Sequence, residues 1–243
     1  MRKTVLITGG SRGLGRACAL KFAQLDYNII INYNNSLKEA VSLEAYLKEN
    51  YNISVLLVKA DISKEDEVIN MVNVIKNSFQ KVDCLVNNAG IAIDTLFEDK
   101  TVQNFKKIID VNLIGTFLVS KYIGALMTNE KSGTIINVSS TNAIDTYYPY
   151  SLDYDASKAG VISLTHNLAR QFAPYIRVNC VAPGWINTEM NKELDKEFIE
   201  EENKKILLGR FSEPSEIANV IAYLASDEAS YINGSVIRVD GGY

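Results

Sequence analysis

Cysteine, proline, histidine and tryptophan are all scarce in this 243-residue sequence, which has 3 Cys, 4 Pro, 1 His and 1 Trp. The cysteines Cys18, Cys84 and Cys180 lie in apolar segments, without Cys-x-x-Cys spacing or a neighbouring histidine. This pattern argues against a disulfide framework and against a metal site. The prolines fall at expected loops or helix ends, and no Pro-rich or Ser-rich stretch divides the chain. We therefore expect one domain that comprises residues 1–243.

A large excess of charge and long apolar runs are missing too. The formal net charge is −4, which gives no overall attraction to nucleic acid or to an anionic membrane. The first apolar run, residues 5–7, is too short for a signal sequence or a membrane span. The expectation is a cytoplasmic protein with neither nucleic acid nor a membrane as a partner.

What the sequence does contain is an alternation of short β-branched runs with helix-length stretches. In the latter, apolar residues recur every three or four positions, as at Leu14, Cys18 and Phe22. The β-branched runs are typical of strands that are buried on both faces. They cover residues 5–7, 29–31, 55–58, 85–86, 135–138, 178–181 and 236–239. The alternation predicts a doubly wound, Rossmann-type α/β fold, with a parallel sheet of about seven strands and helices on both faces.

The first predicted strand leads into a glycine-rich turn and then into a helix. Glycine can adopt positive φ and allows close backbone approach, and the free N–H groups of a helix N-terminus attract phosphate. The turn includes Gly9, Ser11, Arg12, Gly13, Leu14 and Gly15. Its spacing is not Gly-x-Gly-x-x-Gly, so the turn alone indicates either tight packing or a dinucleotide site.

Four motifs, in chain order, resemble the signature of the short-chain dehydrogenase/reductases. They are Thr8-Gly9-x-x-x-Gly13-x-Gly15, Asn87-Asn88-Ala89-Gly90, Tyr154-x-x-x-Lys158, and Pro183-Gly184 with Thr188. The resemblance covers nearly the whole chain, through to Asp240-Gly241-Gly242. It implies an oxidoreductase that uses a nicotinamide dinucleotide.

The resemblance also implies which residues bind the cofactor. Beyond the glycine turn they are Asp61 and Ile62 at the adenine, Asn88, Ala89 and Gly90 beneath a ribose, Tyr154 and Lys158, and Pro183, Gly184, Ile186 and Thr188 near the nicotinamide. Taken alone, Asp61 is also a helix-start signal. A structural turn that holds the central strand would likewise explain Asn88 and Gly90.

The end of the second predicted strand indicates which dinucleotide is preferred. An NAD site usually has an acidic residue there, about 20 residues past the glycines, on the ribose 2′-hydroxyl. This sequence has Asn32-Tyr33-Asn34-Asn35-Ser36, with no carboxylate to repel a 2′-phosphate. Arg12 can offer its guanidinium to that phosphate, and Asn34 a hydrogen bond. NADP(H) is therefore the predicted cofactor, and the alternative for Arg12 is a plain exposed loop arginine.

Reduction of a ketone requires a hydride donor on one face and an acid at the oxygen. Tyr154 and Lys158 are four residues apart, so on a helix they share one face. A neighbouring ammonium is expected to lower the pKa of tyrosine from its usual value of about 10. By resemblance, Tyr154 is the acid, Lys158 also holds the nicotinamide ribose, Ser140 holds the carbonyl oxygen, and Asn112 binds a water that links the lysine to solvent.

Several of these assignments have alternatives. Ser139 and Thr141 stand next to Ser140, at the same predicted strand end. Asn112 interrupts an apolar helical stretch, where partners from the backbone alone would also satisfy its amide. His166, the only histidine, is expected on a helix surface or at a subunit contact.

The whole-chain likeness is closest to the 3-oxoacyl-[acyl-carrier-protein] reductase branch of the family. That branch implies a small-molecule or acyl-thioester substrate, with acyl carrier protein as a candidate partner. Two features depart from it. An aromatic loop, residues 146–151, precedes Tyr154, and Pro174-Tyr175 stands near a docking position that is basic in the branch, although Lys131 matches the other such position. Reductases of acetoacetyl-CoA, sugars or steroids therefore remain open, as does a dinucleotide sensor without catalytic activity.

The expected substrate flap covers residues 189–208. Its most charged part, residues 193–205, predicts a helix with a solvated acidic face. Apolar residues on several sides of the predicted helices 105–127 and 154–172 predict a subunit interface, and the resemblance implies a homotetramer.

Overall fold

The computed structural model describes residues 2–146, 148–191 and 194–243, and it has one seven-stranded sheet in the order β3-β2-β1-β4-β5-β6-β7. Every neighbouring pair is parallel. The strands are β1 (Thr4–Ile7), β2 (Asn28–Tyr33), β3 (Val55–Lys59), β4 (Cys84–Asn87), β5 (Gly133–Val138), β6 (Ile176–Pro183) and β7 (Val236–Val239). The predicted fold class is confirmed.

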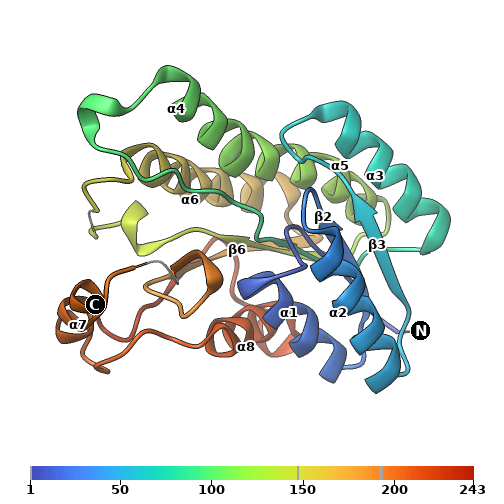
Figure 1. The fold of residues 1–243 in the computed structure, drawn as a ribbon. Helices are drawn as coiled ribbons and strands as arrows, with labels where there is room; N and C mark the ends of the chain where they lie inside the picture. The colour runs from blue at the N-terminus through green and yellow to red at the C-terminus, as the bar shows by residue number, and fades with distance from the viewer. Residues whose placement is uncertain (1, 147, 192–193) are drawn as a thin grey trace.

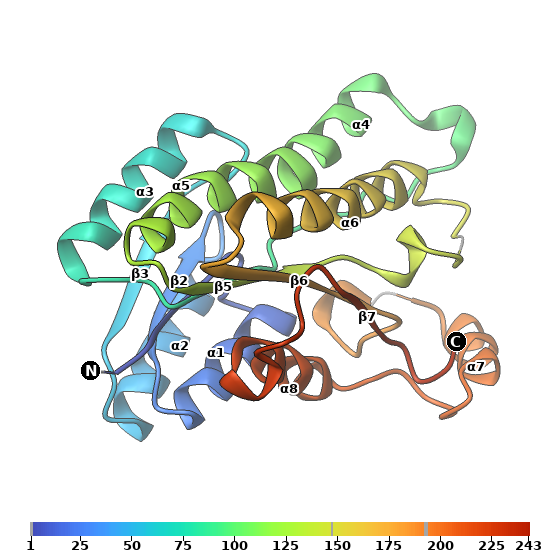
Figure 2. The same cartoon turned by 180° about the vertical axis from the view of Figure 1, so that it is seen from behind.

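Helices cover both faces of this sheet, as Figures 1 and 2 show. On one face lie α1 (Gly13–Gln24), α2 (Leu37–Asn50) and α8 (Pro214–Ala225). On the other lie α3 (Glu65–Ser78), α4 (Val102–Ile109), α5 (Gly115–Asn129) and α6 (Leu152–Phe172). The short helix α7 (Lys196–Lys205) belongs to the expected flap and lies beside the sheet rather than over it. Lys192 and Glu193 of that flap are outside the described residues, as is Tyr147 of the aromatic loop.

The three-layer packing, with helices on both faces of the sheet, explains the apolar character of the strands. All four residues of β1 are buried, because helices pack against it from both sides. On the α1 side, Cys18 and Phe22 lie in the core, whereas Leu6 of β1 points into the second core, beneath α3 and α5. Each helix therefore needs only one apolar stripe, while the strands need two apolar faces.

The position of the site follows from the strand order, which runs outward from β1 in both directions. Strand β1 pairs with β2 on one side and with β4 on the other, so that Ile7 is in register with both Ile31 and Val86. In open α/β sheets, ligands bind at such a switch point, outside the carboxyl ends of the strands. The loops that follow β1, β2, β4, β5 and β6 all emerge at that edge.

One predicted helix differs in detail. The expected helix over residues 105–127 is a continuous helical segment from Val102 to Asn129, in which a π-helical turn, Asp110–Ile114, joins α4 to α5. By length and composition this segment could cross a membrane, but half of its most apolar window is buried inside the molecule, as in a core helix.

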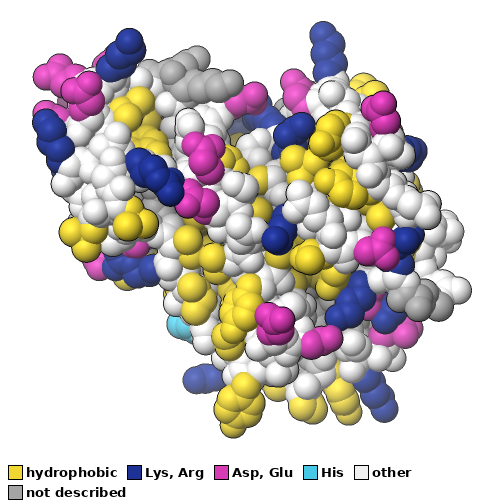
Figure 3. Space-filling view, turned by 90° about the horizontal axis from the view of Figure 1, so that it is seen from below, with side chains coloured by type: hydrophobic (Ala, Val, Ile, Leu, Met, Phe, Trp, Pro, Cys, Tyr) yellow, Lys and Arg dark blue, Asp and Glu magenta, His cyan; other side chains and the backbone are white. Residues whose placement is uncertain are grey.

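On the face seen in Figure 3, basic and acidic side chains are interspersed with apolar ones.

Candidate dinucleotide and catalytic site

The glycine turn between β1 and α1 is fixed by steric constraints. Gly9 and Gly13 have φ of +59° and +52°, a region that L side chains rarely adopt. A Cβ atom on Gly15 would lie 2.2 Å from the carbonyl oxygen of Gly9, so no other residue fits there without a backbone shift. Ser11 and Leu14 are buried, with Leu14 in the core beneath the turn.

The outer side of the same turn fits a pyrophosphate. The first N–H groups of a helix have no intrahelical partner, and in α1 no side chain caps them and no acidic residue lies in the first turn. A Cβ atom on Gly13 would meet only the Thr188 side chain, at 3.7 Å. The turn therefore offers open backbone donors to an anion, and Thr188 lies beside them.

The end of β2 holds one unexpected feature. Asn32 is buried, and its side chain donates to the carbonyl oxygen of Ala60 (3.1 Å) and accepts from the backbone N–H of Gly9 (3.4 Å). Asn32 thus supports the glycine turn instead of facing a ligand. Asn34 and Arg12 are exposed, which leaves both side chains free to reach a ribose phosphate.

The adenine end follows β3. Asp61 accepts from the N–H and hydroxyl of Ser63, at 3.1 and 2.6 Å, so that it shapes a turn before α3. Ile62 is buried against Gly115. A cavity of about 360 Å³ opens beside Asp61 and Val111, and its lining includes Lys106 and Lys107 of α4.

The turn after β4 is tied directly to the glycine turn. The Thr8 hydroxyl accepts from the backbone N–H groups of Asn88 (3.0 Å) and Ala89 (3.1 Å). The Asn88 amide in turn donates to the carbonyl oxygens of Thr8 and Gly9. These bonds give Asn88 the structural role that was an alternative to cofactor contact. At Gly90, a Cβ atom would stand 3.4 Å from the Lys158 ammonium nitrogen, so this turn borders the catalytic residues.

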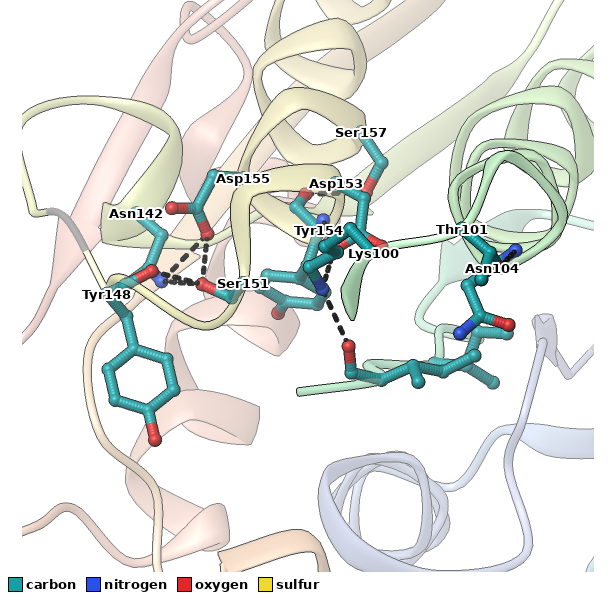
Figure 4. Close-up of polar contacts among 12 residues, drawn as sticks. Lys100, Thr101, Asn104, Asn142, Tyr148, Ser151, Asp153, Tyr154, Asp155 and Ser157 are labelled. Carbon is teal, nitrogen blue, oxygen red and sulfur yellow. Dashed lines mark hydrogen bonds and ion pairs between the residues drawn. The ribbon is translucent and has the colours of Figure 1, made fainter. Parts of the chain in front are cut away.

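Tyr154 and Lys158 lie one turn apart near the start of α6, as predicted. The Lys158 Nζ atom lies 5.6 Å from the centroid of the Tyr154 ring and donates to the carbonyl oxygen of Val138 (2.8 Å). The last residue of β5 therefore holds the lysine in place. Figure 4 shows Tyr154 among the polar residues around the beginning of α6.

The serine assignment is resolved by orientation. Strand β5 ends at Val138, so Ser140 does not close the strand but caps the short 3-10 turn Thr141–Ala143. Its side chain lies close enough to Tyr154 to lower the pKa of the phenol. Ser139 is buried and donates to the backbone of α6, at the carbonyl oxygen of Lys158 (2.8 Å), and Thr141 is buried too. Ser140 is thus the member of the trio that shares the site with the tyrosine.

The protonation of the pair differs from the expectation. Burial raises the pKa of Tyr154 to about 12, and Ser140 offsets only part of that increase. Burial likewise lowers the pKa of Lys158 to about 8. The predicted lowering of the tyrosine pKa by the ammonium is therefore wrong, because desolvation of the phenolate dominates.

Asn112 lies in the π-helical turn and is fully buried. Its amide oxygen accepts from the N–H of Ile91 (2.8 Å), and its amide nitrogen donates to the carbonyl oxygen of Ile91 (3.0 Å) and to the Ser157 hydroxyl (3.0 Å). These contacts satisfy both N–H bonds, but one partner is the Ser157 hydroxyl, so the amide is not satisfied by the backbone alone. A hypothetical Cβ atom on Gly90 would lie 3.4 Å from both Asn112 Oδ1 and Lys158 Nζ, so the two groups border the same space.

The loop after β6 leads to Thr188, whose side chain lies beside Gly13 of the glycine turn. Pro183 ends β6, and a Cβ atom on Gly184 would clash with Asp240 at 2.9 Å. Ile186 forms a parallel bridge with Ser212, which fixes the loop that leads to Thr188. His166 is exposed on α6, as expected for a surface residue.

An ion pair that sequence reasoning missed lies beside Tyr154. Lys100 donates to Asp153 (2.7 Å) and to the carbonyl oxygen of Ile93 (2.8 Å), and the two charged side chains are only 7% and 0% exposed. Asp153 also accepts from the backbone N–H of Tyr154 (3.1 Å). The pair ties the loop after β4 to the start of α6 (Figure 4). Nothing in the local pattern marks either residue, since they are 53 positions apart.

Comparison with known proteins agrees with this arrangement. Residues 9–243 match a family model described as enoyl-(acyl carrier protein) reductase. The chain is 40% identical to the 3-oxoacyl-[acyl-carrier-protein] reductase FabG of Staphylococcus epidermidis, over 100% of this chain and 99% of that protein. It is 38% identical to the 3-oxoacyl-[acyl-carrier-protein] reductase of Synechocystis, over 99% and 96% of the two chains.

Solved structures show the same likeness. The crystal structure of levodione reductase superposes with a TM-score of 0.94 at 35% identity, covering 99% of this chain and 96% of that one. A dehydrogenase/reductase from Sinorhizobium meliloti has a TM-score of 0.92 at 30% identity, with 99% and 94% covered.

Proposed function

Since the chain belongs to the short-chain dehydrogenase/reductase family of oxidoreductases, we propose that it reduces a ketone to a secondary alcohol with NADPH, and that its substrate is a 3-oxoacyl thioester carried by acyl carrier protein. The observation that carries the proposal is that Ser140, Tyr154 and Lys158 lie together at the edge of the sheet where the glycine turn opens, with the Lys158 Nζ atom 5.6 Å from the centroid of the Tyr154 ring and Ser140 close enough to lower the pKa of the phenol.

Tyr154 is the proton donor in this proposal. With a pKa of about 12 it keeps its proton at neutral pH, and Ser140 lies close enough to lower that pKa, so we propose that both hydroxyls serve one position. A carbonyl oxygen at that position accepts hydrogen bonds from both, and the tyrosine proton moves to it as negative charge develops. When bound, NADPH supplies the hydride for the carbonyl carbon.

Lys158 and Asn112 maintain the donor. With a pKa of about 8, Lys158 is mainly an ammonium at neutral pH, and its charge favours the phenolate left after proton transfer. Asn112 anchors the loop of Ile91 against α6 through Ser157, and its Oδ1 atom retains a lone pair toward the space it shares with Lys158. A water held there would return a proton to the site.

The preference for NADPH is supported by the residues around the end of β2. Asn34 and Arg12 are exposed, and the segment Asn32 to Ser36 contains no carboxylate. Asn32 itself does not contact the ribose, because its side chain is buried and donates to the carbonyl oxygen of Ala60. An added 2′-phosphate would therefore meet a guanidinium and amides rather than a negative charge.

The thioester substrate is supported by the two curated relatives, whose names state that activity. One surface feature is compatible with an acidic carrier protein. Lys131 is exposed, and its Nζ atom lies 5.8 Å from the ring centroid of Tyr175, so the two expected docking positions are neighbours in space. Only one of them is basic in this chain.

A ring-shaped ketone is the second candidate. Aromatic residues from separate segments pack together near the site: Tyr148 contacts Tyr150, Trp185 and Phe198, with ring centroids 5.3, 5.9 and 5.9 Å away. An aromatic surface of this kind suits a flat or cyclic compound better than a flexible acyl chain.

The experiment that tests the proposal is NADPH oxidation by the purified protein. Acetoacetyl thioesters of CoA and of acyl carrier protein are compared with a panel of cyclic and sugar ketones, and each substrate is tested with NADH as well. The proposal predicts the highest kcat/KM for the carrier-protein thioester with NADPH. Faster reduction of a free cyclic ketone would replace the first candidate with the second, and binding of NADPH without turnover of any ketone would favour a sensor.

We propose as well that the protein is a homotetramer and that it is located in the cytoplasm. Apolar side chains are exposed on the α4–α6 side, among them Val102 (73%), Phe117 (41%) and Leu152 (45%). Their burial between subunits would remove apolar surface from water. Sedimentation of a stable 27.0 kDa monomer at micromolar concentration would contradict the tetramer.

A further inference from the structure

Glu202 is a buried acid in the middle of an otherwise charged and exposed helix. Its neighbours Glu200 and Glu201 on α7 are exposed, whereas Glu202 is only 4% exposed. The expected solvated acidic face is therefore wrong at this one residue. A buried carboxylate must be paired to persist, so the partners of Glu202 show what α7 is attached to.

Three donors meet this carboxylate. The indole Nε1–H of Trp185 donates to it at 2.9 Å, Lys205 Nζ lies 2.5 Å away on the same helix, and the Tyr243 phenol donates to the oxygen that also accepts from the indole. Burial raises the pKa of Glu202, but the donors outweigh burial and hold the pKa below its ordinary value. The side chain is thus a carboxylate at neutral pH, with donors from three separate segments.

Trp185 links this carboxylate to the nicotinamide end of the site. Its backbone carbonyl accepts from the N–H of Ser212 (3.0 Å), and it directly follows Pro183-Gly184. Three positions later, Thr188 lies beside the glycine turn. The loop is therefore held at its backbone by one segment and at its side chain by Glu202.

The same ring is also part of the aromatic packing near the catalytic tyrosine. Trp185 stacks on Phe211 with centroids 5.4 Å apart, and it meets Phe198 of α7 edge to face at 5.5 Å and Tyr148 at 5.9 Å. Tyr148 precedes α6, so the ring joins the flap helix to the loop before Tyr154. The indole N–H is the only polar group of this ring, and Glu202 is its partner.

We infer that Glu202 is a positioning residue that fixes the flap helix α7 to the cofactor-side loop through Trp185, and that it thereby sets the affinity for the ketone. This inference rests on the proposed function. The carboxylate acts through Trp185 and α7, whose aromatic side chains Phe198 and Tyr148 depend on the position of the indole. Coenzyme binding at the glycine turn does not depend on it.

The sole tryptophan makes the inference testable without turnover. Trp185 is the only Trp in the chain, so tryptophan emission reports this position alone. The test compares Glu202→Gln with Glu201→Gln, which makes the same change of charge at an exposed residue of the same helix. For Glu202→Gln we expect emission at longer wavelength and acrylamide quenching increased by about twofold or more, because the indole loses a charged acceptor. Glu201→Gln should match the wild type.

Kinetics then separate positioning from chemistry. For the ketone with the highest kcat/KM, Glu202→Gln should raise KM by about tenfold, with a smaller change in kcat and an unchanged dissociation constant for NADPH. Trp185→Phe, which keeps a ring but loses the N–H, should raise KM similarly, and the double variant should be no worse than either single variant. Tyr243→Phe removes one donor and should cause the same changes to a smaller degree, which keeps the test available if Glu202→Gln does not fold.

Two results would overturn the inference. One is a folded Glu202→Gln variant with the quenching and the KM of the wild type, and the other is an additive double variant. If the wild type reduces none of the ketones, the proposed function fails, but the quenching comparison still decides whether Glu202 holds the indole.

Discussion

The coenzyme side of the cleft is shaped by backbone, whereas the substrate side is shaped by large side chains. Around the glycine turn, the constraints are positive φ at Gly9 and Gly13 and a steric limit at Gly15. On the other side, Tyr148, Trp185 and Phe198 pack with one another and with a buried carboxylate.

This difference explains why the coenzyme side can be recognised from a single sequence and the substrate side cannot. A backbone cradle accepts few residue types at each position, so its motif can be recognised in a single sequence. An aromatic wall can be built from many combinations of residues and contributors, so its specificity is not readable from local spacing. The following predictions test the two sides in order of expected effect.

The largest effect is expected between the two sides, at the proton donor. Tyr154→Phe removes the phenolic proton and should lower kcat by about 10³-fold, within the range of general acid catalysis. NADPH affinity should stay within about twofold, because the glycine turn is untouched. Rates of NADPH oxidation and titration of coenzyme fluorescence measure the two quantities. A variant with near-normal turnover would exclude Tyr154 as the acid.

The next effect concerns the ion pair of Lys100 and Asp153. Lys100→Met leaves a buried carboxylate without its partner and should reduce the free energy of unfolding by about 3–5 kcal/mol. Urea denaturation measures the change. Lys48→Met, at an exposed i,i+4 pair with Glu44, is the control and should cost less than about 1 kcal/mol. Equal effects at the two sites would show that burial does not matter here.

The pKa of Lys158 predicts a dependence of stability on pH. The folded protein binds this proton more weakly than the unfolded chain, at about 8 against 10.5, so wild-type stability should rise as the pH passes from 8 to 10.5. Below pH 8 the ammonium costs about 3 kcal/mol, from 2.5 pKa units at 1.36 kcal/mol each. Lys158→Met lacks this cost, so its stability relative to wild type should fall by about that amount between pH 7 and pH 10.5. Parallel denaturation curves across this range would refute the depressed pKa.

Alanine substitutions at Gly15 and Gly209 distinguish the effect of a steric clash from the effect of a positive φ. Gly15→Ala should lower stability by about 1–3 kcal/mol through overpacking and weaken NADPH binding. Gly209→Ala is the control: φ is +69°, but a Cβ atom there meets nothing within 4 Å, so only a conformational cost of about 1 kcal/mol is expected. Thermal unfolding with and without NADPH measures both. If Gly15→Ala binds NADPH normally, the cradle tolerates more than its geometry indicates.

The smallest effect is expected at Arg12, on the coenzyme side. Arg12→Ala should weaken NADPH about tenfold and leave NADH unchanged, because only the 2′-phosphate meets the guanidinium. Arg16→Ala, an exposed arginine one turn further along α1, is the matched control. Equal loss for NADPH and NADH would place Arg12 at the pyrophosphate instead.

Much of the fold and of the catalytic set was predictable from local pattern. The strands and the four-residue spacing of Tyr154 and Lys158 can both be recognised from the periodicity of residues within one segment. Local pattern did not separate Ser140 from its polar neighbours Ser139 and Thr141, because all three stand at the same strand end. The tertiary structure separates them: Ser139 donates to the backbone of α6 and Thr141 is buried, whereas Ser140 acts on Tyr154.

The remaining features depend on contacts between distant segments. Whether an acid is solvated or buried is a property of its surroundings, and the donors to Glu202 from outside its helix are 17 and 41 residues away. The same holds for Asn32, which faces the glycine turn 23 residues earlier in the chain. The pKa of Tyr154 was misjudged for this reason, since spacing along a helix reports the neighbouring ammonium but not the burial that raises the pKa to about 12.

By itself, the sequence determined the alternation of strands and helices, the glycine turn and the one-turn spacing of Tyr154 and Lys158 on a helix, because each is encoded by steric preference or periodicity within a short segment. Tertiary structure alone decided which polar side chains are buried, which of them pair, and how the aromatic rings meet around Trp185. Desolvation and pairing act through space, so they take effect only when the chain has folded.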